Sequence, residues 1–484
     1  MGSIQQTLDD EFDVVVVGAG IAGINAAYRL QTELPGCRYT ILEARGEIGG
    51  TWNFFRYPGL RSDSDLHTYG FQWRPWIKDN PIADGASITK YMKESASIHG
   101  IDRHIQFLHD LSSAGWSSKK KSWTLTVQSG DETKYIGAQF LILGTGYFDY
   151  KEALPAIIPG IENFKGTLIH PQFWPADLDY NNKRMVVVGS GATAITLIPS
   201  LADKASHITM LQRSPSYIMS MSNGKNWIEK LMPGWLSRKL ARLRFLIIPF
   251  LLFRFCRAYP STARRLIRSA TIEQIPKTIP HDPHFEPEYN PWEQRLCLCP
   301  DGDFFKCLRE GKASIATGRI KTVTEAGISL ESGETLDADI IVTATGLKLQ
   351  LGGGARIFVD GQQINIAEKF LWRGVMLQDV PNCALVIGYT NASWTLGADT
   401  TAMLVCRLLK YLTRHRMRSA VPKLGRSTIL RSLPTLNLSS TYIQAAPGAF
   451  PKSGDQGPWK PRENYFRDYF NAAYGDIESG LQFS

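Results

Sequence analysis

Two stretches of the chain share one pattern of apolar and small residues. The first starts with the apolar run Val14–Val17, continues as Gly18-Ala19-Gly20-Ile21-Ala22-Gly23, and leads into an amphipathic segment that ends near Leu30. A run of β-branched residues is typical of a strand buried on both faces of a parallel sheet. A second apolar run, Tyr39–Leu42, ends at Glu43. We therefore predict a strand, a helix and a second strand in succession.

The spacing within this first unit predicts a dinucleotide-binding site. Gly18 permits the tight turn, Gly20 lets the backbone approach a pyrophosphate, and Gly23 lets the helix pack on the strand. Glu43 follows about 20 residues later, where an acidic side chain accepts hydrogen bonds from a ribose. The chain then runs Gly49-Gly50-Thr51-Trp52, which would place the ring of Trp52 over a flavin.

The second unit repeats the pattern but differs at its end. Its strand, Met185–Val188, is followed by Gly189-Ser190-Gly191-Ala192-Thr193-Ala194 and a helical segment. The next apolar run leads to Gln212-Arg213-Ser214, where an NAD site would carry an acid. A guanidinium binds a 2′-phosphate and a carboxylate repels it, so Arg213 predicts NADPH rather than NADH. Two dinucleotide sites in one chain indicate electron transfer between two cofactors, and FAD is the economical partner of NADPH.

Two further apolar runs indicate how the units are connected. Phe140–Leu143 is followed by Gly144-Thr145-Gly146, and Asp339–Thr343 is followed by Ala344-Thr345-Gly346. Each is typical of a sheet strand whose end closely approaches a neighbouring backbone. We expect an α/β fold with two Rossmann-like dinucleotide-binding domains, the second inserted in the first. The predicted boundaries are 1–150 and 345–484 for the FAD-binding domain, 176–344 for the NADPH-binding domain and 151–175 for the connection.

The basic charge of the protein is concentrated in one segment. The 484 residues include 54 Lys and Arg against 45 Asp and Glu, a formal net charge of +9. Residues 231–272 contain no acidic residue and nine basic ones, namely Arg238, Lys239, Arg242, Arg244, Arg254, Arg257, Arg264, Arg265 and Arg268. These nine account for the whole excess, which argues against a general nucleic-acid-binding surface. We expect a basic helical insertion at about 220–285.

The basic segment leaves two main interpretations open. The apolar run Phe245–Phe253 has cations before and after it. It could form a lid that packs on the NADPH-binding domain, or make reversible contact with an anionic membrane surface. No nucleic-acid partner is expected. Pro249 argues against a single continuous helix, and the run is shorter than the roughly 20 residues that a membrane-spanning helix needs.

Other features concern the compartment and the chemistry. Met1–Asp13 is polar and lacks the apolar core of a signal peptide, so a cytoplasmic protein is expected, peripheral to a membrane if the basic segment binds one. The seven Cys are odd in number and form no CxxC pair, which favours free thiols and gives no expected metal site. No Cys pair lies between Cys37 and Cys256, which argues against a flavin disulfide reductase.

The connection between the two units carries a motif of a known family. Residues 164–175 match the FxGxxxHxxxW[P/D] fingerprint of type I Baeyer–Villiger monooxygenases at Phe164, Gly166, His170, Trp174 and Pro175. The chain therefore resembles this family of flavin monooxygenases. Three further blocks, 56–65, 290–296 and 388–396, resemble those of its ethionamide-activating subgroup.

The resemblance implies an FAD-dependent, NADPH-consuming enzyme that forms a C4a-peroxyflavin from O₂. This peroxide would insert one oxygen atom into a ketone to give an ester or lactone. The resemblance assigns Arg295 as the permanent cation of the site and Asp63 as the carboxylate that orients it, with an ion pair between the two. Arginine suits this role because it stays protonated near neutral pH.

Other functions stay open on the residues alone. The same chemistry oxygenates sulfur or nitrogen, so S- or N-oxygenation of a small apolar substrate is the first alternative. An NADPH oxidase that releases H₂O₂ is expected if the pocket is open to water. A non-enzymatic nucleotide-binding or membrane-associated protein is the most distant alternative.

The expected site residues form two sets and one separate position. The FAD set is Gly18, Gly20, Ile21, Ala22, Gly23, Glu43, Gly50, Thr51, Trp52, Asp63, Tyr69 and Leu111. The NADP set is Arg61, Ser62, Asp63, Gly189, Ser190, Gly191, Ala192, Thr193, Ala194, Arg213, Ser214 and Arg295. Trp394 is expected beside the substrate or the nicotinamide.

Overall fold

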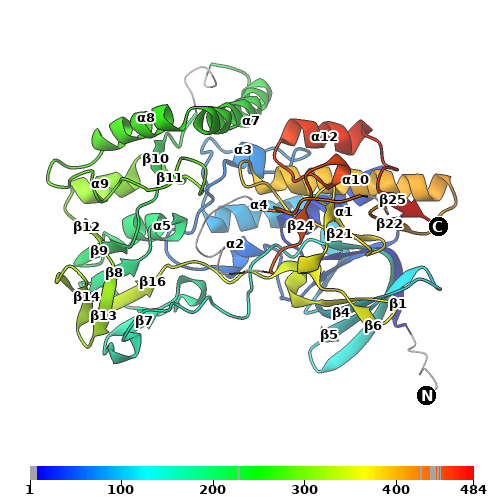
Figure 1. Ribbon diagram of the computed structural model, residues 1–484, viewed down its shortest axis with the longest axis horizontal. Coiled ribbons are helices and arrows are strands. Elements are labelled where there is room, and N and C mark those ends of the chain that lie inside the picture. The colour runs from blue at the N-terminus through cyan, green and yellow to red at the C-terminus, as the bar shows by residue number, and fades with distance from the viewer. Residues whose placement is uncertain are drawn as a thin grey trace.

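The structure is a computed structural model that describes residues 8–225, 229, 231–425, 428–436, 443, 446 and 448–484. Two large sheets organise it and lie side by side in Figure 1. The sheet that contains the N-terminal strand lies on the right, and the second sheet lies on the left. This arrangement confirms the predicted α/β fold with two Rossmann-like units.

The first sheet has parallel strands at its centre. β1 pairs in parallel with β2 and β6, β2 pairs with β3, and β4 and β5 continue from β6 as antiparallel strands. Its eleven strands are β1 (Asp10–Val17), β2 (Tyr39–Glu43), β3 (Ile105–Phe107), β4 (Asp110–Ser117), β5 (Ser122–Ser129), β6 (Glu132–Leu143), β17 (Arg356–Val359), β18 (Gln362–Gln363), β19 (Leu371–Trp372), β20 (Met376–Leu377) and β21 (Cys383–Leu385).

The valines of β1 explain why this strand lies at the centre of the sheet. Val14 and Val16 share a core with helices α1 (Ile21–Glu33), α4 (Gly85–Ile98) and α10 (Trp394–Arg414). Val15 and Val17 share another core with β5 on the opposite face. Because both faces are covered, every position of this stretch needs an apolar side chain, as the continuous run predicted.

The second sheet is parallel throughout. Its order is β12, β9, β8, β16 and β7, with bounds β7 (Thr167–Ile169), β8 (Arg184–Val188), β9 (His207–Gln212), β12 (Ala313–Thr317) and β16 (Ile340–Thr343). Helices α5 (Ala192–Leu201) and α9 (Asp303–Arg309) share the core on one face. The antiparallel strands β13 (Ile320–Thr324), β14 (Gly327–Leu330) and β15 (Thr335–Asp337) supply residues to the core on the other face.

The path of the chain shows how the two units are connected. The chain leaves the first sheet after β6, builds the second sheet from β7 to β16, and returns to the first sheet at β17. The second unit is therefore inserted in the first, as predicted. Residues 151–175, which were expected to connect the two units, also contribute β7. This strand pairs with β16 at the edge of the second sheet. The domain boundaries by residue number stay a prediction.

Two long helices form the upper edge of the molecule in Figure 1, α7 (Gly234–Ala258) and α8 (Pro260–Ile272). The expectation that Pro249 would interrupt this segment was wrong, because α7 is one helix of 25 residues. Proline removes a single backbone hydrogen bond, and the turns on both sides of Pro249 keep theirs. Among the described residues, no helix combines the length and the apolarity needed to cross a bilayer.

The remaining elements are short or lie near the C-terminus. The helices are α2 (Thr51–Phe54), α3 (Leu66–Tyr69) and α12 (Tyr465–Tyr474). The strand pairs are β10 (Ile218–Met221) with β11 (Cys297–Pro300), β22 (Ala420–Pro422) with β25 (Leu481–Phe483), and β23 (Leu433–Pro434) with β24 (Lys452–Ser453). The 3-10 helices are η1 (Ile101–His104), η2 (Ile161–Asn163), η3 (Pro171–Phe173), η4 (Leu351–Gly354), η5 (Ile366–Glu368) and η6 (Gly457–Trp459).

Candidate active site

A cavity of about 500 Å³ lies where the two units meet. Its wall includes the β1–α1 turn of the first unit and the first residues of α5 in the second. Residues 60–64, Arg295 and Trp394 complete other parts of the wall. Both predicted dinucleotide turns therefore reach one and the same cavity.

Two glycines of the β1–α1 turn leave no room for a larger side chain. Gly18 has a φ of +100°, and a Cβ there would lie 2.9 Å from the carbonyl oxygen of Gly144. A Cβ at Gly23 would lie 1.8 Å from the carbonyl oxygen of Gly18, so α1 can approach the turn this closely only with glycine. Gly20 precedes α1 and lines the cavity. The N-terminus of α1 therefore borders the cavity, an arrangement that favours phosphate binding.

Glu43 ends β2 at the cavity wall and is buried. Its Oε2 accepts a hydrogen bond from the N–H of Ala19 at 2.7 Å, and its Oε1 accepts one from the N–H of Arg45 at 3.0 Å. These bonds hold the carboxylate beside the glycine turn. Because each carboxylate oxygen accepts more than one hydrogen bond, Glu43 retains capacity for a ribose hydroxyl.

Aromatic side chains form a large part of the cavity wall. Trp52 donates from Nε1 to the hydroxyl of Tyr69 at 2.7 Å, and the two rings meet edge to face. Tyr147 stacks on Trp394 with ring centroids 4.8 Å apart. Burial raises the pKa of the Tyr69 hydroxyl, so this group is a neutral hydrogen-bond partner at physiological pH.

The turn between β8 and α5 has the same design as the first turn. Gly189 has a φ of +138°, and a Cβ there would lie 2.3 Å from the carbonyl oxygen of Ala344. At Gly191 a Cβ would have no atom within 4 Å, so the space before the α5 N-terminus is open. Ala192 and Thr193 line the cavity. Arg213 is exposed just after β9, outside the cavity wall.

The predicted catalytic pair lies in the wall of this cavity. Asp63 and Arg295 both line it, although they come from distant parts of the chain. Burial raises the pKa of the Asp63 carboxyl, and the positive charges of Arg295 and Arg61 oppose that shift. Arg295 donates from Nη2 to the carbonyl oxygen of Tyr389 at 3.2 Å, which helps to hold the guanidinium in place. A direct ion pair between Asp63 and Arg295 stays a prediction.

Arg61 connects the two units across the cavity. Its guanidinium forms a bidentate ion pair with Asp303 at the start of α9. Ser62, next in sequence, is buried and donates from its hydroxyl to the carbonyl oxygen of Ser64 at 2.7 Å. The segment that carries Asp63 is therefore anchored to the second unit by Arg61 and restrained locally by the bond between Ser62 and Ser64.

Comparison with known proteins identifies the family. Residues 12–232, which include both glycine turns, match the family model described as pyridine nucleotide-disulphide oxidoreductase. The chain is 44% identical over 482 residues to the FAD-containing monooxygenase EthA of Mycobacterium tuberculosis, covering 99% of this chain and 98% of that protein. It is 40% identical over 466 residues to the probable FAD-binding monooxygenase AlmA of Acinetobacter baylyi, covering 95% and 93%. The chain belongs to the FAD-containing monooxygenases.

Solved structures share the fold of this monooxygenase. An ε-caprolactone-bound cyclohexanone monooxygenase matches with a TM-score of 0.74 at 20% identity, covering 98% of this chain and 100% of that chain. An oxidized steroid monooxygenase bound to NADP matches with a TM-score of 0.73 at 20% identity, covering 98% and 99%. At this identity the likeness shows a common fold.

Most residues of the two predicted sets line the monooxygenase cavity. Those in the wall are Gly18, Gly20, Ile21, Ala22, Glu43, Gly50, Thr51, Trp52, Asp63, Tyr69, Leu111, Arg61, Ser62, Ala192, Thr193 and Arg295, together with Trp394. Those outside the wall are Gly23, Gly189, Ser190, Gly191, Ala194, Arg213 and Ser214. Gly23 and Gly189 shape the turns instead, and Ser190 bonds the carbonyl oxygen of Ser214 at 2.9 Å.

The fingerprint residues of the monooxygenase are absent from the cavity wall. A Cβ at Gly166 would lie 2.4 Å from the carbonyl oxygen of Asp339, so this glycine allows β7 to pair closely with β16. Phe164 packs on the core of one face of the second sheet, and Trp174 packs on the other. Burial lowers the pKa of His170, which favours its neutral form. These contacts indicate a structural role for the motif.

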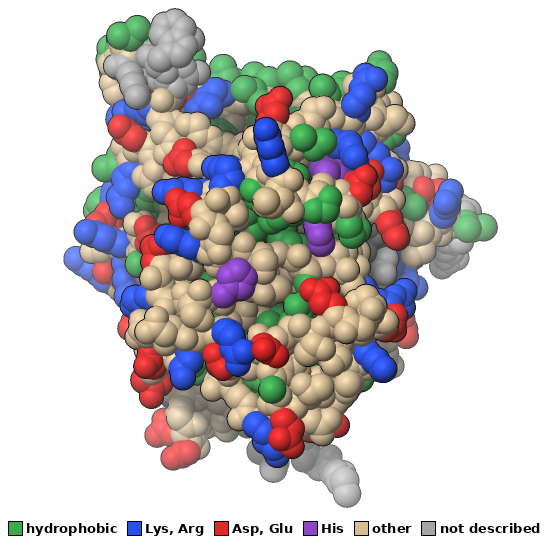
Figure 2. All heavy atoms as spheres, turned by 90° about the vertical axis from the view of Figure 1, so that its left-hand side faces the viewer, with side chains coloured by type: hydrophobic (Ala, Val, Ile, Leu, Met, Phe, Trp, Pro, Cys, Tyr) green, Lys and Arg blue, Asp and Glu red, His purple; other side chains and the backbone are tan. Residues whose placement is uncertain are grey.

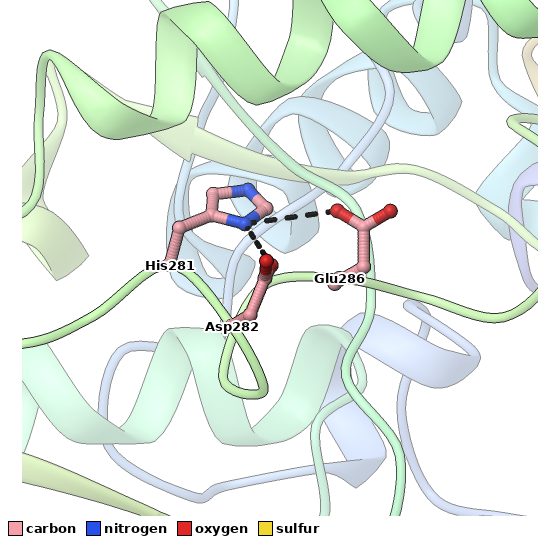
Figure 3. Close-up of side chains that lie close together, drawn as sticks. All are labelled: His281, Asp282 and Glu286. Carbon is pink, nitrogen blue, oxygen red and sulfur yellow. Dashed lines mark hydrogen bonds and ion pairs between the residues drawn. The ribbon is translucent and has the colours of Figure 1, made fainter.

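A separate polar cluster lies after α8, where His281, Asp282 and Glu286 converge (Figure 3). His281 Nδ1 lies 2.7 Å from an Asp282 oxygen and 3.7 Å from a Glu286 oxygen. Arg268 of α8 pairs with both carboxylates at 2.8 and 2.7 Å, and it lowers the pKa of Asp282 to about 2. The cluster therefore anchors α8 to the following loop.

Sequence reasoning missed several residues of the cavity wall. Tyr147, Tyr150, Arg45 and Gln350 all line it. Tyr150 binds the Thr51 hydroxyl at 2.9 Å, and Arg45 donates to the Gly50 carbonyl oxygen at 2.9 Å. The available signal was the small-residue turn after Phe140–Leu143, because both tyrosines follow it directly.

Proposed function

We propose that this monooxygenase uses NADPH and O₂ to convert a ketone into an ester or lactone. The observation that supports the proposal most is the single cavity, whose wall holds the start of both nucleotide-binding helices and the cation of Arg295. Hydride transfer between two cofactors requires that both reach one space. In this proposal 1–150 and 345–484 form the FAD-binding domain, 176–344 form the NADPH-binding domain, and 151–175 connect them.

The side of the cavity next to β1 has the features that FAD requires. The α1 N-terminus favours a pyrophosphate through its free N–H groups and its dipole. Glu43 lies where a ribose hydroxyl can donate to it, and Trp52 and Tyr69 offer an aromatic wall to the flavin. Once bound there, FAD would supply the redox chemistry that activates O₂, and one atom of that O₂ would be the atom transferred.

The side of the cavity next to β8 has the features that NADPH requires. The open space at Gly191 admits a pyrophosphate to the α5 N-terminus without a side chain in the way. Arg213 follows β9 and is free of any acidic neighbour in sequence, so it can bind the 2′-phosphate. We therefore assign the second unit to NADPH.

Arg295 has the properties of the electrostatic group of the reaction. When a ketone carbonyl is attacked, its oxygen gains negative charge, and a preorganised cation stabilises that charge most effectively where water is excluded. The guanidinium is held by the Tyr389 carbonyl and keeps its proton throughout. Burial raises the pKa of Asp63 and the charges of Arg295 and Arg61 oppose that shift; in this proposal the Asp63 carboxyl orients the guanidinium. The rings of Trp52, Tyr147 and Trp394 lie in the same wall, and in this proposal they limit the entry of water.

Product analysis with paired substrates tests this function. The FAD-loaded protein is mixed with NADPH, air, and equal amounts of a cyclic ketone and a thioether, and a sample without O₂ is the control. We expect the ring-expanded lactone as the main product, and none without O₂. A sulfoxide as the main product would establish heteroatom oxygenation instead. Peroxide with neither product would establish an NADPH oxidase.

The proposed setting is the cytoplasm, with reversible membrane contact through residues 231–272. All seven cysteines are free of disulfides, as expected in a reducing compartment. The basic helices α7 and α8 lie together at one edge of the molecule (Figure 1). The reactants are a small organic molecule and O₂.

A further inference from the structure

We propose that the face formed by α7 and α12 docks on an anionic lipid bilayer, with α7 lying along the headgroups. This inference rests on the membrane contact proposed above for residues 231–272 and deepens it. It adds α12, which comes from the C-terminal end of the chain, and it assigns the side of α7 that meets the lipid. It stands independently of the reaction that the protein catalyses.

One side of α7 presents apolar side chains to solvent. Leu243, Ile247 and Leu251 are 49%, 39% and 56% exposed. Their spacing of four residues places them on one side of the helix. Ser237 and Ala241, on the other side, are buried against the protein. The apolar row therefore points away from the molecule.

The helix α12 carries a second row that joins the first. Phe466, Phe470 and Tyr474 recur every four residues and are 43%, 61% and 75% exposed. The ring of Phe466 contacts that of Phe250 on α7, with centroids 5.5 Å apart. The two rows thus form one apolar surface built from distant parts of the chain.

Cations flank this apolar surface. Lys239, Arg254 and Arg257 of α7 are exposed, and α8 adds the exposed Arg265. Residues 231–272 contain no acidic side chain to balance them. On α12, Asp468 lies 3.6 Å from Arg467, so the acidic charge of that helix is offset. The net positive charge of the surface complements an anionic bilayer rather than a neutral one.

The position of the surface suits shallow insertion. The upper rim of the molecule in Figure 2, which corresponds to the edge formed by α7 and α8 in Figure 1, carries hydrophobic side chains with Lys and Arg nearby. Trp235, 58% exposed, lies near the start of α7 with its ring 5.4 Å from the Lys239 ammonium. A helix with exposed apolar residues, flanking cations and an interfacial tryptophan lies in the plane of the headgroups.

The surface is attached to the wall of the cavity. Arg242 of α7 donates to the carbonyl oxygen of His67 at 2.6 Å, and Phe245 stacks on the His67 ring. His67 belongs to α3, which also carries Tyr69 of the cavity wall. Docking would therefore hold the cavity close to the bilayer, where apolar molecules collect.

Vesicle flotation of the full-length FAD-loaded protein tests the proposal. The two vesicle types are pure phosphatidylcholine and an equal mixture of phosphatidylcholine with phosphatidylglycerol. We expect flotation with the mixture and release at high salt, because salt screens the cations. Little flotation is expected with phosphatidylcholine alone. Absence of flotation with the mixture, or equal flotation with both vesicle types, would overturn the proposal.

Matched variants locate the contact. Leu251→Glu combined with Phe470→Glu should weaken binding to mixed vesicles by about tenfold or more, since two apolar anchors are lost. The control variant is Ile77→Glu combined with Ile157→Glu. These two side chains are 75% and 99% exposed and lie outside α7 and α12, so this variant should bind the vesicles normally.

A charge-reversal pair tests the cations separately. Lys239→Glu with Arg265→Glu should lose most flotation, whereas Lys119→Glu with Lys120→Glu, exposed in the β4–β5 turn, should not. If a variant and its control lost flotation equally, the assignment of the membrane contact to the face of α7 and α12 would be contradicted. A stable dimer in solution that does not float would show that a second copy covers the apolar surface instead. Retained FAD absorbance in each variant confirms that the protein is folded.

Discussion

At the scale of single residues, Arg295 has two properties that the proposed reaction needs. It lines the cavity, and its guanidinium is held by a backbone carbonyl that cannot change charge. A positively charged group held in advance stabilises a developing oxyanion without reorganisation at the moment of reaction. The role proposed for Asp63 depends on Arg295, because the charges of Arg295 and Arg61 oppose the rise in the Asp63 pKa that burial causes.

Removal of this cation should separate oxygen transfer from NADPH consumption. In Arg295→Ala we expect ester formation to fall by about 10²–10³, the usual cost of losing an oxyanion-stabilising group. NADPH should still be oxidised, with H₂O₂ as the product. The measurement compares product, NADPH and peroxide per unit time. Arg319→Ala, which changes an exposed arginine of the second unit, is the control. An unchanged ratio of ester to NADPH in Arg295→Ala would contradict the assigned role.

Arg213 is the residue that we propose selects the nicotinamide cofactor. Arg213→Ala should raise the KM for NADPH by about tenfold or more, because a charge-assisted bond to the 2′-phosphate is lost. The KM for NADH, which lacks that phosphate, should stay the same. Lys183→Ala, at another exposed cation of the unit, should leave both values unchanged. If Arg213→Ala affects NADH as strongly as NADPH, the exposed guanidinium has another role.

Single residues also show where sequence reasoning reaches its limit. The glycines were predictable because close backbone contacts and positive φ values exclude other residues, as at Gly18 and Gly23. The small-residue turn before Tyr147 and Tyr150 was visible in the sequence, but the direction of their side chains was not, because it depends on how β6 ends against its neighbours. The ion pair of Arg61 with Asp303 joins two units, and no local pattern encodes such a pair.

At the scale of elements, the two nucleotide turns share a shape but differ in what surrounds their glycines. Gly23→Ala places a Cβ 1.8 Å from the Gly18 carbonyl oxygen, so α1 must move away from β1. We expect this variant to lose FAD and to unfold at a lower temperature. Gly191→Ala places its Cβ in open space, so stability and FAD content should stay normal while NADPH binding weakens.

The difference between Gly23→Ala and Gly191→Ala is measured by thermal unfolding, FAD absorbance and NADPH affinity. If Gly191→Ala lost FAD, or if Gly23→Ala kept normal stability, the assigned packing of the two turns would be wrong.

The contact between α3 and α7 should make stability depend on pH. Burial lowers the pKa of His67 to about 4, from an ordinary value of about 6.5. The charged groups around it are Glu229, Arg244, Arg242 and Lys225. Because the folded state binds the proton less tightly than the unfolded state, the contribution of neutral His67 is present above about pH 6.5 and lost as pH falls toward about 4.

The variant His67→Gln tests this dependence. Its unfolding temperature should fall less between pH 6.5 and 4 than that of the parent protein, because glutamine does not titrate. The measurement is thermal unfolding of both proteins across this window. Identical pH profiles would show that His67 is not the group that destabilises the contact.

The elements themselves were predicted unevenly, for physical reasons. Strands β1 and β8 and the helices that follow them were clear, because burial on both faces leaves a continuous apolar run. The continuity of α7 through Pro249 was not predicted, because a local rule for proline ignores the packing on either side. The strand β7 was missed because three residues carry too little periodicity to be recognised.

At the scale of the whole molecule, two units enclose one cavity and a basic helical edge lies beside it. The repeated turn predicted the two units, and the apolar runs Phe140–Leu143 and Asp339–Thr343 predicted that the second is inserted in the first. Neither pattern predicted that both turns would reach a common space. That arrangement depends on long-range contacts such as Arg61 with Asp303, whose partners are distant in the chain. The excess positive charge is likewise a local property, confined to α7 and α8.

The origin of the transferred oxygen atom distinguishes the proposed oxygenation of a ketone from other ways of consuming NADPH. The FAD-loaded protein is given NADPH and a cyclic ketone under ¹⁸O₂ in unlabelled water, and the product is analysed by mass spectrometry. We expect a lactone with one ¹⁸O atom, and one NADPH consumed for each lactone molecule formed. A product without the label, or peroxide formed in place of product for each NADPH consumed, would contradict the proposed oxygenation.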